Sequence, residues 1–309
     1  MSRSFKIVLA FAAIYLIWGS TYLAIKFAIA TIPPFLMAGA RFLVAGAIMY
    51  VFARLRNSER PTPLHWRSAT IIGGLLLMGG NGGVTWAEQY VPSGLTALLI
   101  ATVPLWITVL NWLHHDRIRP GVREIGSVLL GLIGLAILVG PEELIGKGRI
   151  DLIGAGVLIT ASLLWSFGSL YSRHAPLPSN PLLSIGMEML AGGAILAVVG
   201  LASGETARID LSAVSAQSIW SILYLILVGA LIGFTAYVWL LKQTSPNLVA
   251  TYAYVNPVVA VFLGWLLAGE ELTFRTMLAA TVIVAAVVIV TLKPKEKIAA
   301  VPVESKISD

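Results

Sequence analysis

Long apolar runs recur from one end of the sequence to the other, and they restrict the folds that the chain can adopt. A run of about 17–25 apolar residues is long enough to cross the hydrocarbon core of a bilayer as a helix. Inside a membrane every backbone polar group must be bonded within the protein, so only helices and closed β-barrels can span it. The alternation of apolar and polar residues that marks barrel strands is absent. The sequence therefore predicts an all-α integral membrane protein.

Hydropathy and the Pro, Gly, Ser and charged residues between the runs place ten transmembrane helices. They cover residues 7–30, 34–53, 68–87, 95–113, 122–140, 152–171, 182–202, 219–241, 248–268 and 274–292. The chain is 58% apolar and 12% charged, whereas soluble domains average about 45–50% and about 25%. Little of the chain remains for a domain outside the membrane. The first run is not followed by the small-residue cleavage site of a signal peptide, so we expect it to remain as the first span.

The net charge of +6 is explained by topology. If the N-terminus is cytoplasmic, 15 Lys and Arg residues fall in cytoplasmic segments and five in outer segments, with Arg41 inside the membrane. This excess follows the positive-inside rule and predicts that both termini are cytoplasmic. We expect a multi-pass protein of the bacterial inner membrane, with the lipid bilayer as a partner and no nucleic-acid partner. The chain has no cysteine, which excludes disulfides, thiolate metal sites and a Cys nucleophile.

The sequence also contains an internal repeat. Shifts of 147 residues in the first part and 153 in the later part superpose residues of the same type. The pairs include Trp18 with Trp165, Pro34 with Pro181, Gly39 with Gly186, Gly46 with Gly193, Trp86 with Trp239, Pro104 with Pro257 and Trp112 with Trp265. Residues 1–140 and 141–292 then hold five spans each, and the polar segment 293–309 is expected to be a disordered cytoplasmic tail. An odd number of spans inverts the second half, and inverted repeats are typical of secondary transporters with a central site near the midplane.

Several segments resemble a known family. They are WGSTYLAIKFA in the first span, ARFLVAGAI in the second, the proline of the fourth, and GWLLAGEEL at the end of the ninth. Their order over the whole chain is similar to that of the EamA family of the drug/metabolite transporter superfamily, and within it to the YedA-like exporters. The resemblance implies two EamA repeats, a ten-helix bundle around a central cavity, and export of small metabolites or drugs. It does not fix the substrate.

Three aromatic residues and one asparagine are candidates for the wall of that cavity. Trp18 and Trp165 lie near mid-span, where they either line the cavity or pack between the halves, and Tyr22 follows one turn after Trp18. The third span has six glycines between residues 73 and 83, which permit close helix packing or mark a hinge. Asn81 in this stretch needs a hydrogen-bond partner, because an unbonded amide in hydrocarbon is costly.

Spans four and nine carry a pair of prolines, Pro104 in IATVPLW and Pro257 in LVATYAYVNPVVAVFLGW. A proline removes a backbone donor and bends a helix. We interpret the pair as matched kinks that shape one cavity, with kinks that only improve packing as the alternative. The polar and aromatic neighbours of the two prolines complete the set of cavity candidates, namely Thr102, Tyr252, Tyr254 and Asn256.

Arg41 and Glu188 are charged residues near the middle of spans two and seven, and the repeat pairs them. A charge at mid-helix costs at least about 2.5–3.5 kcal/mol on insertion scales, so each must face protein or water. Because the repeat is inverted, we expect them roughly 10 Å apart along the membrane normal, as two polar posts on opposite sides of the cavity and not as a salt bridge. Substrate binding and a structural role stay open for both, and Glu188 is also a candidate proton site. Lys26 and Glu88 lie near the outer interface, where snorkelling is expected.

Catalysis finds little support, and the chain is not expected to be an enzyme. The four histidines fall in cytoplasmic loops, and the HHD segment at 114–116 is interpreted as a solvated loop and not as a metal site. No Walker A sequence is present, so ATP is not the direct driver. We expect neither a metal nor a cofactor.

These observations favour a secondary-active exporter that works by alternating access. Its expected substrates are small metabolites, such as amino acids or related neutral, zwitterionic or aromatic compounds, or drugs. The alternatives are an exchanger of phosphorylated or nucleotide-linked sugars, which would need several deep cations, and a non-transporting membrane scaffold or enzyme. Residues 122–140 and 274–292 are almost free of polar groups, which suits scaffold helices and a homodimer contact through them.

Overall fold

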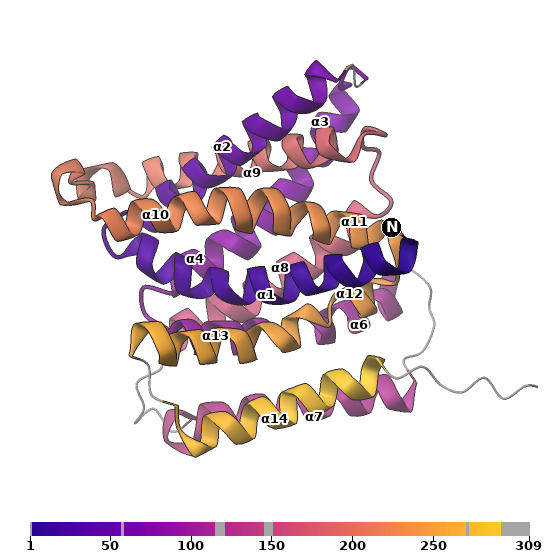
Figure 1. The fold of residues 1–309 in the computed structure, drawn as a ribbon, viewed down its shortest axis with the longest axis vertical. Helices are drawn as coiled ribbons and strands as arrows, with labels where there is room; N and C mark the ends of the chain where they lie inside the picture. The colour runs from indigo at the N-terminus through magenta and orange to yellow at the C-terminus, as the bar shows by residue number, and fades with distance from the viewer. Residues whose placement is uncertain (1, 57–58, 115–120, 145–150, 270–271, 292–309) are drawn as a thin grey trace, which may run out of the picture.

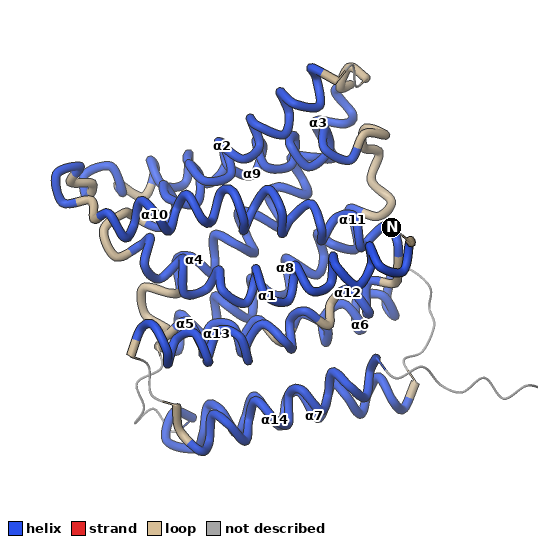
Figure 2. The backbone as a smooth tube through the Cα atoms, in the orientation of Figure 1, coloured by secondary structure: helices blue, strands red, loops and turns tan. Residues whose placement is uncertain are grey.

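The computed structural model describes residues 2–56, 59–114, 121–144, 151–269 and 272–291. Over these residues the protein consists of helices and connecting loops, without a strand (Figure 2). Six of the described helical segments, of 21 to 28 residues, are long and apolar enough to cross a bilayer. The prediction of an all-α membrane protein is confirmed.

The helical elements follow one another in this order. They are α1 (Arg3–Ile29), α2 (Pro34–Leu55), α3 (Pro63–Ile72), η1 (Gly73–Gly82), α4 (Gly83–Ala87), α5 (Ser93–Ile100), α6 (Val103–His114), α7 (Val122–Leu144), α8 (Leu152–Ser172), α9 (Pro181–Ala202), η2 (Glu205–Arg208), η3 (Leu211–Ala213), α10 (Ala216–Tyr224), η4 (Leu225–Phe234), α11 (Thr235–Gln243), α12 (Pro246–Val249), α13 (Tyr252–Ala268) and α14 (Phe274–Thr291). Elements α3, η1 and α4 run into one another without a break, and so do α10, η4 and α11.

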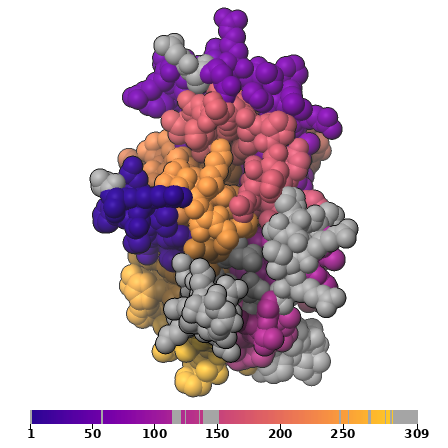
Figure 3. Space-filling view, turned by 90° about the vertical axis from the view of Figure 1, so that its right-hand side faces the viewer, coloured from indigo at the N-terminus to yellow at the C-terminus, as the bar shows by residue number. Residues whose placement is uncertain are grey.

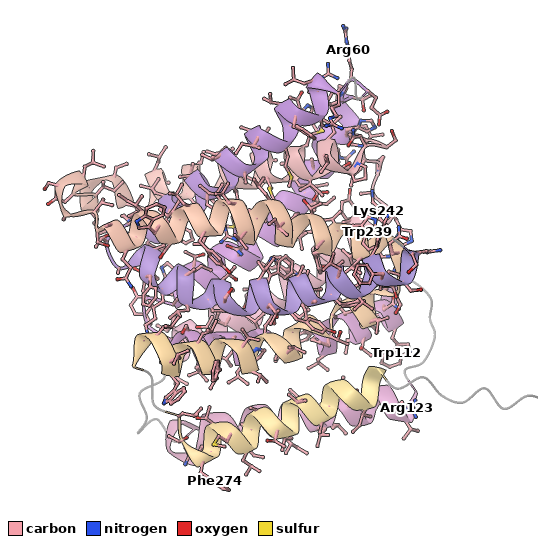
Figure 4. The ribbon with its side chains drawn as sticks, in the orientation of Figure 1. Arg60, Trp112, Arg123, Trp239, Lys242 and Phe274 are labelled. Carbon is pink, nitrogen blue, oxygen red and sulfur yellow. The ribbon has the colours of Figure 1, made fainter. Side chains whose placement is uncertain are left out.

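The helices lie side by side and are stacked along the longest axis of the molecule (Figure 1). Helices α2 and α9 pack together at one end of the stack, and α7 and α14 at the other. Between them, α1 packs against α13, and α8 packs against η1, α5 and α6. The start of α1 and the end of α14 lie at the same edge of the molecule (Figure 1). Arg60, Arg123 and Lys242 lie at this edge too, and Phe274 lies at the opposite one (Figure 4).

Helices α2 and α9 approach each other so closely that their backbones touch. Two glycines from each helix make the contact, Gly39 and Gly46 from α2 and Gly186 and Gly193 from α9. A Cβ atom on Gly186 would lie 2.7 Å from the backbone nitrogen of Tyr50. Small residues permit such an approach between membrane helices. All four glycines of the two repeat pairs thus lie in this interface, where they meet crosswise, Gly39 against Gly193 and Gly46 against Gly186.

The start of α2 is fixed by a carboxylate from a distant part of the chain. Glu205 in η2 is 1% exposed and accepts hydrogen bonds from the backbone N–H groups of Phe35 at 3.2 Å and Leu36 at 2.9 Å. The first N–H groups of a helix lack partners within it, and the positive end of the helix dipole favours an anion. Glu205 thus anchors the helix that carries Arg41.

Two of the predicted spans contain a ten-residue π-helical stretch, η1 and η4. Each N–H in such a stretch bonds to the carbonyl five residues earlier, and long π-helical stretches are rare. The first residues, Gly73 and Leu225, are 152 positions apart, close to the repeat offset. The glycines of η1 also pack closely, since a Cβ atom on Gly73 would lie 2.5 Å from the carbonyl oxygen of Glu188. Of the two interpretations of this segment, close packing is present. The hinge stays a prediction, and the helix runs on from α3 through η1 into α4 without a break.

Spans four and nine break, although not at their prolines. The fourth divides between α5 and α6, and Pro104 stands in the first turn of α6, where its missing N–H leaves no bond unmade. The ninth divides at residues 250–251, before α13, and Pro257 lies inside α13. The two prolines thus occupy different positions in their helices, and the expectation of matched kinks was wrong.

Helices α7 and α14 pack against each other and α14 also packs against α13, as expected for scaffold helices. Ile125, Ile133 and Met277 on their outer faces are 47%, 53% and 55% exposed. A homodimer contact through this pair stays a prediction. His115 and Asp116 of the HHD segment, and the tail from residue 292 onward, lie outside the described residues.

Candidate functional site

A small cavity lies at the centre of the stack, enclosed by α1, α2, η1, α4, α5, α8, η4 and α13. The centre of a water molecule can reach about 50 Å³ of it. That volume has room for a few waters, whereas sites for small molecules occupy about 300–1,000 Å³. The cavity in this structure is therefore smaller than such sites. Its lining consists of Trp18, Thr21, Tyr22, Ile25, Arg41, Phe42, Leu77, Gly80, Asn81, Val84, Ile100, Ala161, Ser162, Trp165, Gly229, Phe234, Tyr252 and Asn256.

Trp18 is at the centre of a cluster of aromatic rings. Its ring centroid lies 5.5 Å from that of Trp165 and 5.0 Å from that of Tyr252, both edge-on, and 4.9 Å from that of Tyr237. Its Nε1 donates a hydrogen bond to the carbonyl oxygen of Gly229 at 3.1 Å. Aromatic pairs of this kind add about 0.5–1.5 kcal/mol beyond the area that they bury. The sequence left open whether Trp18 and Trp165 line a cavity or pack together, and the structure has them do both.

Tyr237 on α11 fixes the position of Trp165. The Nε1 of Trp165 donates to the hydroxyl oxygen of Tyr237 at 3.1 Å, and Ser169 Oγ lies 2.5 Å from the same oxygen. The Tyr237 ring is 1% exposed. The ring of Phe234 completes the cluster, with its centroid 6.4 Å from those of Trp18 and Trp165 and 6.3 Å from that of Tyr237. Polar and apolar contacts together thus hold one wall of the cavity rigid.

Arg41 provides a buried positive charge on the opposite helix, α2. Its side chain is 2% exposed, and its guanidinium lies 4.6 Å from the centroid of the Phe42 ring. Its Nε and Nη1 atoms have no hydrogen-bond partner among the described residues. Glu88 at the end of α4 acts electrostatically on Arg41 and on Tyr22. Two donors of Arg41 are therefore available to a ligand.

Glu88 corrects one expectation from the sequence. It was expected to snorkel at the outer interface, but its side chain is only 7% exposed. The cause is the packing of α4 against α1 and α2, which covers the end of the short helix. The position of Glu88 near the end of its span was therefore a poor guide to the exposure of its side chain.

Two asparagines face the cavity in different ways. The side-chain oxygen of Asn81 is buried and has no hydrogen-bond partner among the described residues. Asn256 is 1% exposed, and in the orientation that satisfies its neighbours its amide nitrogen donates to the carbonyl oxygens of Tyr252 at 3.1 Å and Tyr15 at 3.0 Å. Asn81 thus offers an acceptor to a ligand, whereas Asn256 ties α13 to α1.

Several of the other predicted residues lie beside the cavity and not on its wall. Thr102 is buried behind Ser162, and their hydroxyl oxygens are 2.7 Å apart. Pro104 and Pro257 do not belong to the lining. The side chain of Tyr254 lies outside the part of the chain that the structure describes.

Glu188 is likewise separate from the cavity. It is 1% exposed within α9, and neither of its carboxylate oxygens has a hydrogen-bond partner among the described residues. Lys242 at the end of α11 acts on it electrostatically. Of the two expected polar posts, Arg41 stands on the cavity wall and Glu188 does not.

Some residues of the cavity lining, and Tyr237 behind it in the ring cluster, were not anticipated from the sequence. Phe234 lies near the middle of the predicted span 219–241, so the depth argument that selected Trp18 applies to it as well. Tyr237 lies closer to the span end, where a belt residue is the usual interpretation. Gly229 and Ser162 carry no signal of their own, because small residues are common throughout membrane helices.

The lining of the cavity offers several kinds of contact for binding. It combines aromatic ring surfaces with the donors of Arg41 and the acceptor of Asn81. Among the described residues, no three His, Asp or Glu side chains are placed to hold a metal ion. The arrangement suits reversible binding of a small molecule that has both charged and apolar parts.

Comparison with known proteins decides the family. The model of the EamA-like transporter family matches residues 5–140 and again residues 152–292. The chain belongs to this family. It is similar to the uncharacterized inner membrane transporter YedA of Escherichia coli K12, with 41% identity over 286 residues that cover 92% of this chain and 90% of that protein.

More distant relatives agree with this assignment. The uncharacterized transporter YoaV of Bacillus subtilis is 25% identical and covers 90% of this chain and 94% of its own length. A probable amino-acid metabolite efflux pump of Salmonella typhimurium is 24% identical, with coverage of 88% and 90%. A protein of known crystal structure, 22% identical, shares the fold with a TM-score of 0.69 over 94% of this chain and 98% of that chain. The predicted EamA membership is confirmed, and the protein is a membrane transporter and not an enzyme.

Proposed function

We propose that this EamA transporter exports small amino-acid-like molecules across the inner membrane by alternating access. The observation that carries the proposal is the composition of the central cavity. It combines the ring cluster around Trp18 and Trp165 with donors of Arg41 and an acceptor of Asn81 that have no partner in the part of the chain that the structure describes. Transport is driven by a gradient of substrate or ions, because the chain carries no Walker A sequence for ATP.

A zwitterion with an apolar side chain matches these features. Its carboxylate pairs with Arg41 through charge-assisted hydrogen bonds, and its ammonium donates to Asn81. Its side chain packs on the rings, where each well-placed aromatic contact contributes about 0.5–1.5 kcal/mol. A buried polar group without a partner costs about 1–3 kcal/mol. A molecule without the carboxylate would leave Arg41 in that state and is therefore discriminated against.

We further propose that ten spans form two inverted repeats of five. The helix contacts support this, since α1 packs against α13 as α8 packs against α5 and α6. Helices α2 and α7 pack against their counterparts α9 and α14. The family model also matches twice along the chain. Two halves related in this way give the cavity equivalent routes to both sides of the membrane.

The direction and the location are supported by relatives and by charge. One relative is named an inner membrane transporter and another an efflux pump. The basic residues Arg60, Arg123 and Lys242 lie at the edge where α1 begins (Figure 4), and under the positive-inside rule this supports a cytoplasmic N-terminus.

Thermal unfolding of the purified protein tests the substrate class. The ligands are phenylalanine, phenethylamine, which lacks the carboxylate, and 3-phenylpropionate, which lacks the ammonium. Phenylalanine at about 100 times its Kd should stabilise the folded state by about 2.7 kcal/mol, and each truncated analogue should stabilise it less. Arg41→Gln should remove the preference for the carboxylate, and Arg173→Gln, an exposed residue outside the cavity, should keep it.

Equal stabilisation by phenethylamine and phenylalanine would contradict the proposal. A response to glucose 6-phosphate alone would instead favour the sugar-phosphate exchanger. Counterflow of labelled phenylalanine in proteoliposomes then separates transport from binding. Saturable flux that Arg41→Gln abolishes supports an exporter, and binding without flux supports a non-transporting scaffold.

A further inference from the structure

A wide groove opens on the side of the bundle near the edge where α1 begins. It lies between the start of α1, the C-terminal half of α2, the start of α9, and η4 with α11, and its volume is about 1,210 Å³. Figure 3 looks onto this edge, with the indigo start of α1 beside the orange α11 and the pink residues around α9. We call it the basic groove, because Lys6 and Arg56 line it.

The walls of the basic groove divide into an apolar part and a charged end. Leu9, Ile48, Phe52 and Ile232 line it and are 54%, 45%, 45% and 52% exposed. Contact with the hydrocarbon of the bilayer removes such side chains from water and is therefore favourable. Lys6, in the first turns of α1, brings a cation to the edge of this apolar surface.

Two cations and one carboxylate make up the charged end. The Arg56 guanidinium lies 4.7 Å from the centroid of the Phe52 ring. Glu59 also lines the groove, and it accepts hydrogen bonds from the backbone N–H and, at 2.8 Å, from the hydroxyl of Ser179. Those two bonds hold the pKa of the Glu59 carboxyl below its usual range, because they stabilise its negative charge. Lys6 and Arg56 form no ion pair among the described residues, so the end keeps a net positive charge.

The chain contains a second groove that serves as an internal comparison. It has a volume of about 580 Å³ and lies between η1, α4 and the start of α8. The repeat offset of 147 relates its Ile153 to Lys6, and the offset of 153 relates its Trp86 to Trp239 of the basic groove. The two grooves thus follow from the same packing, but an isoleucine replaces the lysine in the second. The positive charge is particular to the basic groove.

We propose that the basic groove binds an anionic phospholipid of the cytoplasmic leaflet. The phosphate lies at the charged end of the groove, to which Lys6 and Arg56 belong, and one acyl chain lies along the apolar part with Leu9, Phe52 and Ile232. Basic pockets between membrane helices on the cytoplasmic side suit acidic head groups, with about 1 kcal/mol for each Lys or Arg. The assignment to the cytoplasmic leaflet rests on the orientation in the proposed function.

Such a lipid would lie next to the substrate cavity. Leu231 and Thr235 line the groove, and Phe234 between them lines the cavity. Thr235 also contacts Met49 of α2, with 4.0 Å between Oγ1 and Sδ. A bound acyl chain would therefore lie against the outer side of the contact between α2 and α11, one side chain away from the cavity.

Lipid binding to the purified full-length protein in detergent tests the proposal. Native mass spectrometry measures the apparent Kd of dioleoyl phosphatidylglycerol and of dioleoyl phosphatidylcholine. Wild type should prefer phosphatidylglycerol, and Lys6→Gln/Arg56→Gln should weaken its binding by about 30-fold, the factor expected for two basic contacts. The control Arg60→Gln/Arg67→Gln removes two exposed cations outside the groove and should leave binding unchanged.

A second measurement locates the lipid. Phosphatidylglycerol with brominated acyl chains should quench tryptophan fluorescence more than the brominated phosphatidylcholine does, and Trp239→Phe should remove that excess. Equal binding of the two lipids by wild type, or a preference that survives in Lys6→Gln/Arg56→Gln, would overturn the proposal. Competition by inorganic phosphate alone would assign the groove to free phosphate. Dimers that form without lipid and bury Trp239 would assign it to a second copy of the chain. None of these measurements uses a transport substrate. The lipid proposal can therefore be tested even if the proposed substrate class is wrong.

Discussion

The contact between α2 and α9 leads to a prediction about stability. Alanine at Gly186 would place its Cβ atom 2.7 Å from the backbone nitrogen and 3.0 Å from the Cα atom of Tyr50. Both are backbone atoms, so no side-chain rotation relieves the clash and the helices must separate. Overpacking of this kind costs about 1–3 kcal/mol. Replacing a helical glycine by alanine recovers about 0.5–1 kcal/mol of backbone entropy, so the expected net effect of Gly186→Ala is a loss of up to about 2.5 kcal/mol.

Gly156→Ala in α8 is the matched control, because a Cβ atom there meets nothing within 4 Å. This substitution should retain the entropic gain and stabilise the protein slightly. The assay is thermal unfolding of both variants in the same detergent, where about 1 kcal/mol corresponds to roughly 2–4 °C for a protein of 150–250 residues. We expect Gly186→Ala to melt several degrees below Gly156→Ala. Equal midpoints, or a rise for Gly186→Ala, would refute the close backbone approach.

Three further predictions concern the cavity and its surroundings. Arg41→Leu should impair transport far more than expression, as measured by counterflow and by membrane yield, and equal loss of both would assign Arg41 a structural role. Trp18→Phe leaves the Gly229 carbonyl without its donor and should cost about 1–3 kcal/mol of unfolding free energy, whereas an unchanged melting midpoint would mean that this bond contributes nothing. Hydrogen bonds from Ser179 lower the pKa of Glu59 in the folded protein. The stability that these bonds contribute should therefore be present at any pH above the unfolded pKa of about 4.3, and it should be lost as the pH falls through the lower folded pKa. The measurement is hydrogen exchange at the Ser179 amide, corrected for its intrinsic rate. Protection of this amide should decrease only in acid, and Glu59→Gln should reduce it at neutral pH. Protection that depends on neither pH nor Glu59 would contradict this prediction.

The sequence carried much of the fold because its signals were local. The apolar runs follow from the need to bond every backbone group inside a membrane, and they required no knowledge of packing. The repeat added long-range information, since it paired Trp18 with Trp165 and Gly46 with Gly193 before any contact was known. In the structure the two tryptophans touch and the two glycines lie in the same helix interface.

The remainder depended on tertiary packing, which one sequence does not record. Proline was the natural place to expect a break in spans four and nine, but the fourth breaks before Pro104, which then fits the first turn of α6. Burial of Glu88 depends on the way α4 meets α1 and α2. Tyr237 had no signal because its repeat counterpart is Val84, which carries no hydroxyl and no ring. The aromatic wall thus belongs largely to one half of the chain, and symmetry reasoning does not reveal it.

The small volume of the cavity affects how affinities for this transporter must be interpreted. Under the proposed alternating access, a ligand binds a conformation with a wider cavity than the one in this structure, which leaves about 50 Å³. Apparent Kd then equals the intrinsic Kd divided by the populated fraction of the wider conformation, so a fraction of about 1% weakens apparent binding about 100-fold. A substitution that loosens the ring cluster, such as Phe234→Ala, removes a contact and yet raises that fraction. Tighter apparent binding in such a variant would therefore report a shifted population and not a better site.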